Sequence, residues 1–275
     1  MNSTVKRSIS GVCFLAVVLG GLLFNKYLFA LLLSFILVTM LGEFYRMTMG
    51  DKYKGIRVLA ILLGLCAFFM LFSIMAFGLD IRYICFTAVF LIALMTSTLL
   101  VKEKSDFKLF AFLYTGLMYI AAPLVLSNFV VFDKTGAFNG LPMVAFLCII
   151  WASDVGAYCF GMLFGKNGKK LFPSISPNKS WAGFWGGLGT AVVTGLILNR
   201  TGLFPYPLLH CVILSIIMNI AGVYGDLFES QWKRTFGIKD SGTIIPGHGG
   251  MLDRFDSALF AIPAGVVYLV TIGLI

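Results

Sequence analysis

The polar side chains of this sequence concentrate between residues 230 and 256, a charged, glycine-rich stretch that lies between two strongly apolar segments. Carboxylate oxygens are the ligands that hard cations such as Mg²⁺ prefer. A carboxylate near the depth of a membrane costs about 2.5–3.5 kcal/mol on insertion scales, so each is expected to have a role or a partner. Asp253 and Asp256 of this stretch, with Asp226 just before it, therefore predict a site for Mg²⁺, with one or two cations in all.

Helical spacing places these groups on common faces. If the preceding helix continues to Lys233, then Asp226, Ser230 and Lys233 lie at positions i, i+4 and i+7, on one stripe. Asp253 and Asp256 are i, i+3 neighbours at the start of the next apolar segment and are expected to share a helix face. One alternative stays open, in which the aspartates form only structural ion pairs with Lys233, Arg234 and Arg254.

The cations and glycines of the same stretch favour phosphate binding. Glycine lets backbone N–H groups approach a phosphate closely. Gly249 and Gly250 directly precede an apolar segment, where the N–H groups of a helix start are expected to be free to bind an anion. For His248 a hydrogen-bonding role is favoured over metal ligation, since no second histidine lies nearby. The predicted substrate-binding residues of this stretch are Arg234, Lys239, Asp240, His248, Gly249, Gly250 and Arg254.

Two further polar features lie earlier in the chain. The segment 165–183 is equally a phosphate- or base-binding loop and a solvated basic connector. Its candidate donors are Ser174, Ser176, Asn178, Lys179 and Ser180, and those predicted to bind substrate are Ser176, Lys179 and Ser180. Asp154 lies inside an apolar run, and an ionisable residue there predicts a functional site. The alternative for Asp154 is an interhelical hydrogen bond, with Asn219 as its partner.

The elements that position these residues are apolar helices. With 59% hydrophobic residues, 12% charged residues and a mean hydropathy of +0.96, the chain is far more apolar than a soluble domain. Apolar runs of about 20 residues recur, and only helices satisfy their backbone groups in lipid. We therefore expect an all-α, polytopic integral membrane protein with one membrane domain, 1–275. Residues 1–132 form its N-terminal helices, and 141–275 its catalytic helices and cytoplasmic loops.

About nine transmembrane helices are predicted. Fusion of the first two into one long helix is the main alternative, because only Asn25 and Lys26 separate them. The predicted spans are Ile9–Phe24, Tyr27–Phe44, Val58–Gly78, Ile81–Val101, Phe107–Phe132, Leu141–Phe164, Gly183–Leu198, Pro207–Gly225 and Leu252–Ile275.

Charge and cysteine usage agree with this topology. With nine spans and the N-terminus inside, 17 of the 21 Lys and Arg residues fall on the cytoplasmic side, as the positive-inside rule requires. The stretch 230–256 then faces the cytoplasm. The net charge of +9 is mainly a topology signal, so no nucleic acid is expected as a partner. The six cysteines lie in apolar runs without CxxC spacing, which favours small buried side chains over disulfides or zinc ligands.

The C-terminal half contains an ordered pattern that resembles a known family. The pattern reads Ser230-x-x-Lys233-Arg234-(x)4-Lys239-Asp240-x-Gly242-x-x-Ile245-Pro246-x-His248-Gly249-Gly250-Met251-x-Asp253-Arg254-Phe255-Asp256. It closely resembles that of the CDP-diacylglycerol synthases, also called phosphatidate cytidylyltransferases. The segments Asp154-x-Gly156-Ala157-Tyr158 and Ser176-Pro177-x-Lys179-Ser180-Trp181 are similar to that family's, in the same order.

This resemblance implies a reaction and a set of roles. The family condenses CTP with phosphatidate to give CDP-diacylglycerol and pyrophosphate, and its members form membrane-embedded dimers. By motif, Asp226, Asp253 and Asp256 correspond to the metal-binding carboxylates, and Lys233, Ser230 and Asp226 to the catalytic group. The expected location is the cell membrane, with the active site facing the cytoplasm and membrane lipid around the helices.

The sequence departs from the family pattern at two positions. Trp232 replaces an aliphatic residue or Phe, which indicates a change of packing. Ala182 follows Trp181 where the family commonly has Glu, and this weakens the assignment of the 176–183 loop. Two other functions stay open: a CTP-dependent polyprenol or phytol kinase, and a cation transporter that uses Asp154.

Overall fold

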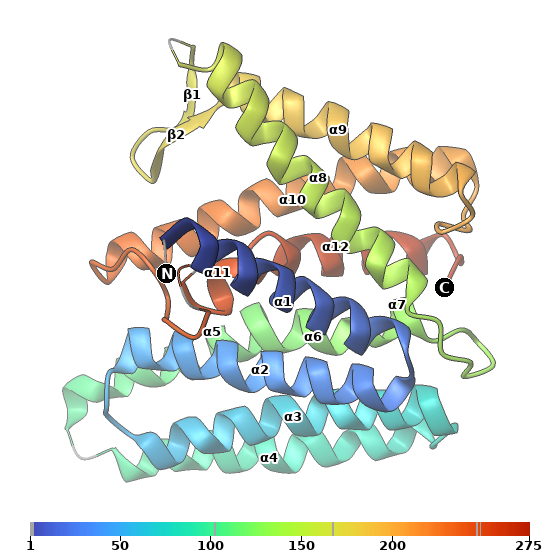
Figure 1. Ribbon diagram of the computed structural model, residues 1–275. Helices are drawn as coiled ribbons and strands as arrows, with labels where there is room; N and C mark the ends of the chain where they lie inside the picture. Colours follow the sequence, from blue (N-terminus) through green and yellow to red (C-terminus); the bar gives the residue numbers. More distant parts are fainter. Residues whose placement is uncertain (1–2, 102, 167, 246, 248) are drawn as a thin grey trace. The chain divides into compact units, whose positions relative to one another are not determined.

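The computed structural model describes residues 3–101, 103–166, 168–245, 247 and 249–275, with side chains from residue 9 onward. Helices dominate it (Figure 1). Contacts within the chain divide it into two compact units. Unit 1 comprises Met1–Phe138 with Asp240–Arg254, and unit 2 comprises Asn139–Lys239 with Phe255–Ile275. The single membrane domain expected from the sequence stays a prediction, and each unit is described by itself.

Unit 1 is built from helices that run back and forth (Figure 1). Three long helices come first, and the later spans are assembled from shorter helical pieces that follow one another directly. In chain order they are α1 (Ser3–Leu23), α2 (Lys26–Met49), α3 (Lys54–Phe77), the 3-10 turn η1 (Ile81–Cys85), α4 (Phe86–Thr96), the 3-10 turns η2 (Ser97–Leu100) and η3 (Lys104–Leu109), α5 (Phe110–Gly116), the π-turn η4 (Leu117–Ala121), α6 (Ala122–Leu126) and α7 (Asn128–Val131).

The first two apolar segments form separate helices. Asn25 has extended backbone, and its side-chain oxygen accepts the N–H groups of Tyr27 at 3.0 Å and Leu28 at 2.9 Å. This is the N-cap arrangement that starts a new helix. The alternative of one fused helix is therefore wrong.

Helix α2 lies in the core of unit 1. Phe29, Phe44 and Tyr45 are fully buried along it. The Tyr45 hydroxyl donates to the carbonyl oxygen of Leu113 at 2.9 Å, and Gly116 leaves room for the Tyr45 ring. These contacts fix the rotation of α2 and therefore the direction of its single carboxylate, Glu43.

Unit 2 contains a small antiparallel hairpin among long helices. The elements in order are α8 (Leu141–Phe164), β1 (Lys170–Phe172), β2 (Ser176–Ser180), α9 (Trp181–Arg200), α10 (Leu208–Thr235) and α12 (Ala258–Thr271). Lys170 pairs with Ser180, and Phe172 pairs with Ser176. The hairpin lies at the end of α8 and the start of α9, as Figure 1 shows. The segment predicted as a loop thus has a defined backbone.

Small residues bring α8 and α9 into close contact. A Cβ atom at Gly156 would overlap the Thr190 side chain, and one at Gly187 would lie 2.9 Å from the carbonyl oxygen of Ser153. Thr190 donates from its hydroxyl to the carbonyl of Ala152 at 3.0 Å. Close approach through small residues is typical of helices packed in lipid. It fixes the face of α8 that carries Ser153 and Asp154.

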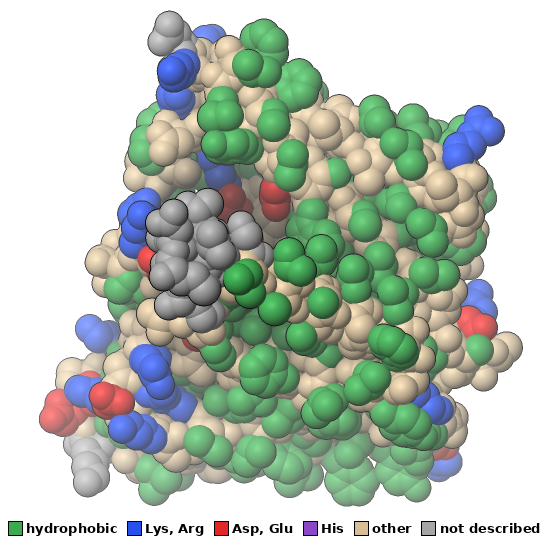
Figure 2. Space-filling view, viewed as in Figure 1, with side chains coloured by type: hydrophobic (Ala, Val, Ile, Leu, Met, Phe, Trp, Pro, Cys, Tyr) green, Lys and Arg blue, Asp and Glu red, His purple; other side chains and the backbone are tan. Residues whose placement is uncertain are grey.

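The prediction of an all-α polytopic membrane protein is confirmed. Within the described residues, seven helices are long and apolar enough to cross a membrane. Figure 2 shows hydrophobic side chains along the helices and Lys and Arg mainly toward their ends. The two remaining predicted spans correspond to shorter apolar helices, Ile9–Leu23 and Ala258–Thr271, so the count of nine is not confirmed.

The predicted span Leu252–Ile275 is interrupted near its start. Helix α11 covers only Leu252–Phe255, and α12 begins at Ala258. The expectation that Asp253 and Asp256 share one face of a continuous helix is therefore wrong. Asp256 lies in the break between the two helices.

All six cysteines are free, so the prediction of no disulfides is confirmed. Their predicted burial is correct for Cys211 and wrong for Cys13, Cys85 and Cys159, which are exposed. In a membrane helix an apolar side chain can face lipid instead of protein. Apolar sequence context therefore does not imply burial here.

Candidate active site

The first candidate site is a cavity of about 500 Å³ in unit 2, at the hairpin; we call it the hairpin cavity. Its size is typical of small-molecule sites. It is lined by α8, the hairpin, α9 and α10. One part of the wall is apolar, with Tyr158, Met162, Leu171, Phe184 and Val223. The remaining wall is polar, and its charged and amide side chains are Asp154, Lys166, Lys170, Asn178, Lys179 and Asp226.

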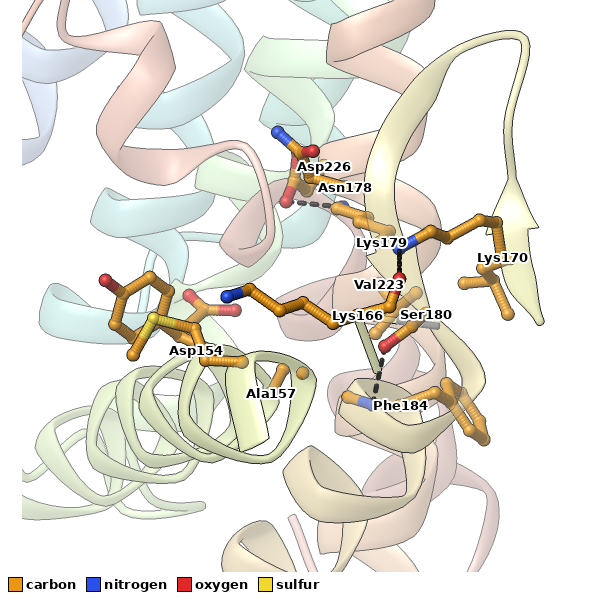
Figure 3. A pocket seen from close by; sticks show the side chains of 15 residues that line it. Asp154, Ala157, Lys166, Lys170, Asn178, Lys179, Ser180, Phe184, Val223 and Asp226 are labelled. Carbon is orange, nitrogen blue, oxygen red and sulfur yellow. Dashed lines mark hydrogen bonds and ion pairs between the residues drawn. The ribbon is translucent and has the colours of Figure 1, made fainter. Parts of the chain in front are cut away.

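The charged side chains come from separate elements. Asp154 belongs to α8, Lys179 to β2 and Asp226 to α10. Figure 3 shows them directed into one space, with Lys166 pointing toward Asp154. The cavity therefore contains four residues predicted from the sequence: Asp154, Lys179, Ser180 and Asp226. A cavity with both charge signs and an apolar wall can hold a ligand that has a charged head and a hydrocarbon part.

Asp226 contacts both a lysine and a serine at the cavity. Its Oδ2 lies 2.5 Å from the Lys179 ammonium, and the side chains are 32% and 26% exposed respectively. Its Oδ1 accepts the hydroxyl of Ser230 at 3.4 Å. Helix α10 continues to Thr235, so the predicted stripe of Asp226, Ser230 and Lys233 is confirmed.

Lys233 is held by a carboxylate that the sequence prediction missed. Its ammonium lies 2.6 Å from Oε2 of Glu229, one turn earlier on α10. Glu229 is fully buried, and the Lys233 side chain is 15% exposed. A buried ion pair of this geometry fixes the position of the lysine, because breaking it leaves an uncompensated charge.

Asp256 approaches α10 at a glycine. A Cβ atom on Gly225 would lie 2.5 Å from the carbonyl oxygen of Asp256, so only glycine permits this contact. Asp256 precedes α12, outside that apolar helix. Burial, and then the negative charge of Asp226, raise the pKa of Asp256 to about 7, and Asp154 adds to this shift. The negative charges of Asp226 and Asp154 therefore both act on Asp256.

This accumulation of carboxylates suits a cation. In the described part of the chain no three carboxylate, histidine or cysteine side chains are grouped so as to hold one ion. Mg²⁺ is commonly held by one or two carboxylates, with water and substrate phosphates as its other ligands. Asp226 and Asp256 fit that arrangement. Asp253 belongs to the other unit, and its role as a third ligand stays a prediction.

In unit 1 the glycine-rich loop is organised by Glu43 of α2. Glu43 Oε1 accepts the N–H of Met251 at 3.0 Å, and Oε2 accepts the N–H of Leu252 at 2.9 Å. These are the N–H groups at the start of α11. The expectation that the donors at this helix start are free is therefore wrong, because a carboxylate of the same unit satisfies them.

Asp253 also contacts this loop. Its Oδ2 accepts the N–H groups of Ser241 at 2.9 Å and Gly250 at 2.7 Å, and the Ser241 hydroxyl at 3.0 Å. Gly249 has a φ of +86°, which favours glycine, and a Cβ atom at Gly250 would overlap Ser241 and Glu43. Both glycines are thus required by the loop itself, and their part in substrate binding stays a prediction.

The other predicted residues lie as follows. Ser180 is buried and caps α9 by accepting the Gly183 N–H at 3.2 Å, and Ser176 lies at the start of β2. Trp232 packs between Phe228 and Phe236 on α10, which agrees with a packing role. His248 lies outside the described residues. The exposed predicted residues are Arg234, Lys239, Asp240 and Arg254.

Two alternatives from the sequence can now be compared with the contacts. Asn219 accepts a hydrogen bond from Ser153 at 2.6 Å, and the neighbouring Asp154 lines the hairpin cavity. The second alternative paired the aspartates with Lys233, Arg234 and Arg254. For Asp226 the structure shows a different partner, Lys179 of the hairpin.

The sequence prediction missed several site residues. Glu43 lies inside a predicted apolar span. An ionisable residue in such a span predicts a functional site, so this position could have identified Glu43 from the sequence. Glu229 precedes Lys233 by four positions, the spacing of a helical ion pair. Lys166 and Lys170 belong to a basic connector, and only the hairpin geometry brings them to the cavity.

Comparison with known proteins gives a consistent family. A sequence profile of the cytidylyltransferase family matches residues 5–272. Phosphatidate cytidylyltransferase of Staphylococcus saprophyticus is 36% identical over 271 residues, 98% of each chain. The Bacillus subtilis protein of that name is 39% identical over 171 residues, 62% of each chain. The Staphylococcus epidermidis protein is 40% identical over 167 residues, 60% of this chain and 61% of the relative.

The last two alignments thus cover about three fifths of the relatives' lengths, and the first covers almost all. Both the profile and the full-length relative include unit 1 and unit 2. The chain belongs to the cytidylyltransferase family.

Proposed function

We propose that this protein is a phosphatidate cytidylyltransferase, a nucleotidyltransferase that converts CTP and phosphatidate into CDP-diacylglycerol and pyrophosphate. The activity is named for a relative that aligns over 98% of both chains. The structural observation that carries the proposal is the hairpin cavity, in which lysines and aspartates adjoin an apolar wall.

The cavity suits a lipid with a phosphate headgroup. Lys166, Lys170 and Lys179 supply cations at its polar part. Tyr158 and Met162 form part of its apolar wall and are themselves 65% and 53% exposed on α8, where a membrane helix meets lipid. An acyl chain can therefore remain beside α8 while the phosphate lies among the lysines. This combination distinguishes a lipid phosphate from a soluble sugar phosphate.

The chemistry needs no side-chain nucleophile. An anionic phosphate oxygen of phosphatidate attacks the α-phosphorus of CTP, so one P–O bond forms there. The bond from the α-phosphorus to the oxygen bridging the β-phosphorus breaks, and pyrophosphate leaves with that electron pair. Both reactants are highly charged, so positioning and charge neutralisation lower the barrier.

Residues of this chain supply that positioning. Lys233, held at 2.6 Å by Glu229, presents a fixed positive charge one turn beyond Ser230 and two turns beyond Asp226. The exposed Arg234, Lys239 and Arg254 are available to the triphosphate. Mg²⁺, when bound, supplies further neutralisation of phosphate charge, and a second cation can share this role. Asp226 and Asp256, with Asp253 as predicted from the sequence, would hold it.

The location and assembly are parts of the same proposal. The relatives are bacterial proteins, which supports the cell membrane as the location. The excess of Lys and Arg on one predicted side supports an active site that faces the cytoplasm, where CTP is available. A homodimer surrounded by membrane lipid is expected from the family resemblance.

The test is a reconstitution with purified protein in detergent, CTP, phosphatidate and Mg²⁺. CDP-diacylglycerol and pyrophosphate are expected in equal amounts. Diacylglycerol in place of phosphatidate serves as the matched acceptor with a hydroxyl and no phosphate. Formation of CDP and a newly phosphorylated lipid with that acceptor, and no CDP-diacylglycerol from phosphatidate, would establish a kinase instead.

A further inference from the structure

Lys179 contacts the carboxylate that is proposed to hold the cation. Its ammonium lies 2.5 Å from Asp226 Oδ2, so the two side chains form a direct ion pair. Lys179 comes from the β-hairpin and Asp226 from α10, 47 positions apart in the chain, so the pair is a tertiary contact. The lysine thus places a positive charge directly at Asp226.

The charges around this pair explain why a cation is needed there. Asp154 and Asp226 line the cavity, and the negative charge of each acts on Asp256. A partly buried cluster of this kind is unfavourable unless cations compensate it. Lys233 is engaged with Glu229, and Lys170 donates to the carbonyl oxygen of Gly165 at 3.0 Å. Lys179, in contrast, pairs directly with the cavity carboxylate Asp226.

We propose that Lys179 occupies the cation position at Asp226 in the substrate-free protein, and that cation and nucleotide displace it toward the phosphates. The inference rests on the proposed function for the identity of those phosphates. Lysine suits such an exchange, because a flexible four-carbon stem carries a compact charge with three rotatable donors. The ammonium of Lys179 then neutralises carboxylate charge before the nucleotide binds and phosphate charge after it binds.

The exchange makes cation binding depend on nucleotide. Without nucleotide, a divalent cation must break the Lys179–Asp226 pair and leave the ammonium without its carboxylate. With nucleotide, the ammonium gains phosphate oxygens in compensation. Removing the ammonium therefore has opposite effects on two quantities: cation affinity without nucleotide rises, and turnover falls. A lysine that only binds phosphate lowers turnover and leaves cation affinity of the free protein unchanged.

The experiment measures Mn²⁺ binding to the purified protein, without substrates, from the EPR signal of free Mn²⁺. Lys179→Met is expected to lower the Kd for Mn²⁺ about fivefold, as expected when a modest ion pair no longer competes. The matched control is Lys170→Met, which removes the same charge from the same cavity but contacts a backbone carbonyl. Equal Kd values for the two variants would overturn the inference.

A second measurement uses the wild-type protein and so does not depend on folding of a variant. Acetylation of Lys179 by an amine-reactive ester, followed by mass spectrometry, is expected to become faster when Mn²⁺ releases the ammonium. Further addition of CTP is expected to slow it again. Lys170 serves as the internal reference. Labelling of Lys179 that does not respond to Mn²⁺ would contradict the exchange.

These results separate the inference from the proposed function. A wild-type protein that makes CDP-diacylglycerol, with equal Mn²⁺ affinity in Lys179→Met and Lys170→Met, contradicts the exchange alone. A protein that makes no CDP-diacylglycerol, but in which Lys179→Met binds Mn²⁺ more tightly, contradicts the function and supports the exchange.

Discussion

Glu229 and Lys233 form an ion pair of 2.6 Å along one face of α10, and the carboxylate of that pair is fully buried. The pair lies in the last turns of α10, which ends at Thr235. Asp226 and Ser230, which contact each other, lie on the same part of the helix. A lysine anchored in this way presents its charge at a fixed place. We therefore assign Glu229 a positioning role toward Lys233.

The first prediction concerns Glu229→Gln. Loss of the carboxylate charge releases Lys233, and kcat/KM for CTP is expected to fall about 100-fold, the effect of a misplacement near 1 Å. The midpoint of thermal unfolding also falls, because one partner of a buried ion pair has been removed. Steady-state assays and melting curves of the detergent-solubilised protein provide both values.

The matched control for this prediction is Gln231→Ala, on the same helix turn with an exposed side chain. It should retain nearly full turnover. If Glu229→Gln turned over CTP at the control's rate with an unchanged melting midpoint, Glu229 would have no positioning role.

The second prediction concerns the glycine at which α10 meets Asp256. Gly225→Ala places a Cβ atom 2.5 Å from the Asp256 carbonyl oxygen, so the contact must open. We expect a loss of about 1–3 kcal/mol in unfolding free energy and a large loss of activity. Gly189→Ala is the control, since nothing lies within 4 Å of a Cβ atom there. Higher helix propensity is expected to stabilise that variant by up to about 1 kcal/mol.

The third prediction concerns the loop organised by Glu43. In Glu43→Gln, an amide NH₂ replaces one acceptor oxygen, so the N–H of Met251 or Leu252 loses its partner. The expected cost is about 1–3 kcal/mol of unfolding free energy. Arg46→Gln, one turn away and exposed, is expected to change it by less than about 0.5 kcal/mol. Equal unfolding free energies in the two variants would remove Glu43 as an organiser of the loop.

The fourth prediction concerns removal of the cation. EDTA is expected to abolish CDP-diacylglycerol formation, and excess Mg²⁺ to restore it. Asp226→Asn and Asp256→Asn should each raise the Mg²⁺ concentration required for half-maximal rate, because each removes a negative ligand oxygen. Full activity in EDTA, or an unchanged Mg²⁺ requirement in both variants, would contradict a cation held by these aspartates.

The sequence predicted the helical class and the face of α10 well, because both follow from periodicity. Apolar runs of about 20 residues require helices in lipid, and the i, i+4, i+7 spacing of Asp226, Ser230 and Lys233 needs only a continuous helix. The break between α11 and α12 was missed. Helical periodicity from Leu252 onward contains no signal for it, and Pro263 lies further along inside α12.

The tertiary partners of the site could not be predicted from spacing. Glu43 is about 200 positions from the N–H groups it accepts, and Lys179 is 47 positions from Asp226. The glycines of the loop have the composition of a phosphate-binding turn. The N–H groups of Gly250, Met251 and Leu252 nevertheless meet carboxylates of the same unit, because buried backbone donors require acceptors wherever these are available. Composition predicts the chemistry that a segment can perform, and the fold decides its partners.

The central claim is cytidylyl transfer to a lipid phosphate, and the fate of isotopic label tests it most directly. Purified protein is supplied with phosphatidate, Mg²⁺ and CTP labelled with ³²P at either the α- or the γ-phosphorus. We predict that α-label enters the lipid product while γ-label is released as pyrophosphate. Lipid that carries γ-label, with α-label recovered in CDP, would contradict the account.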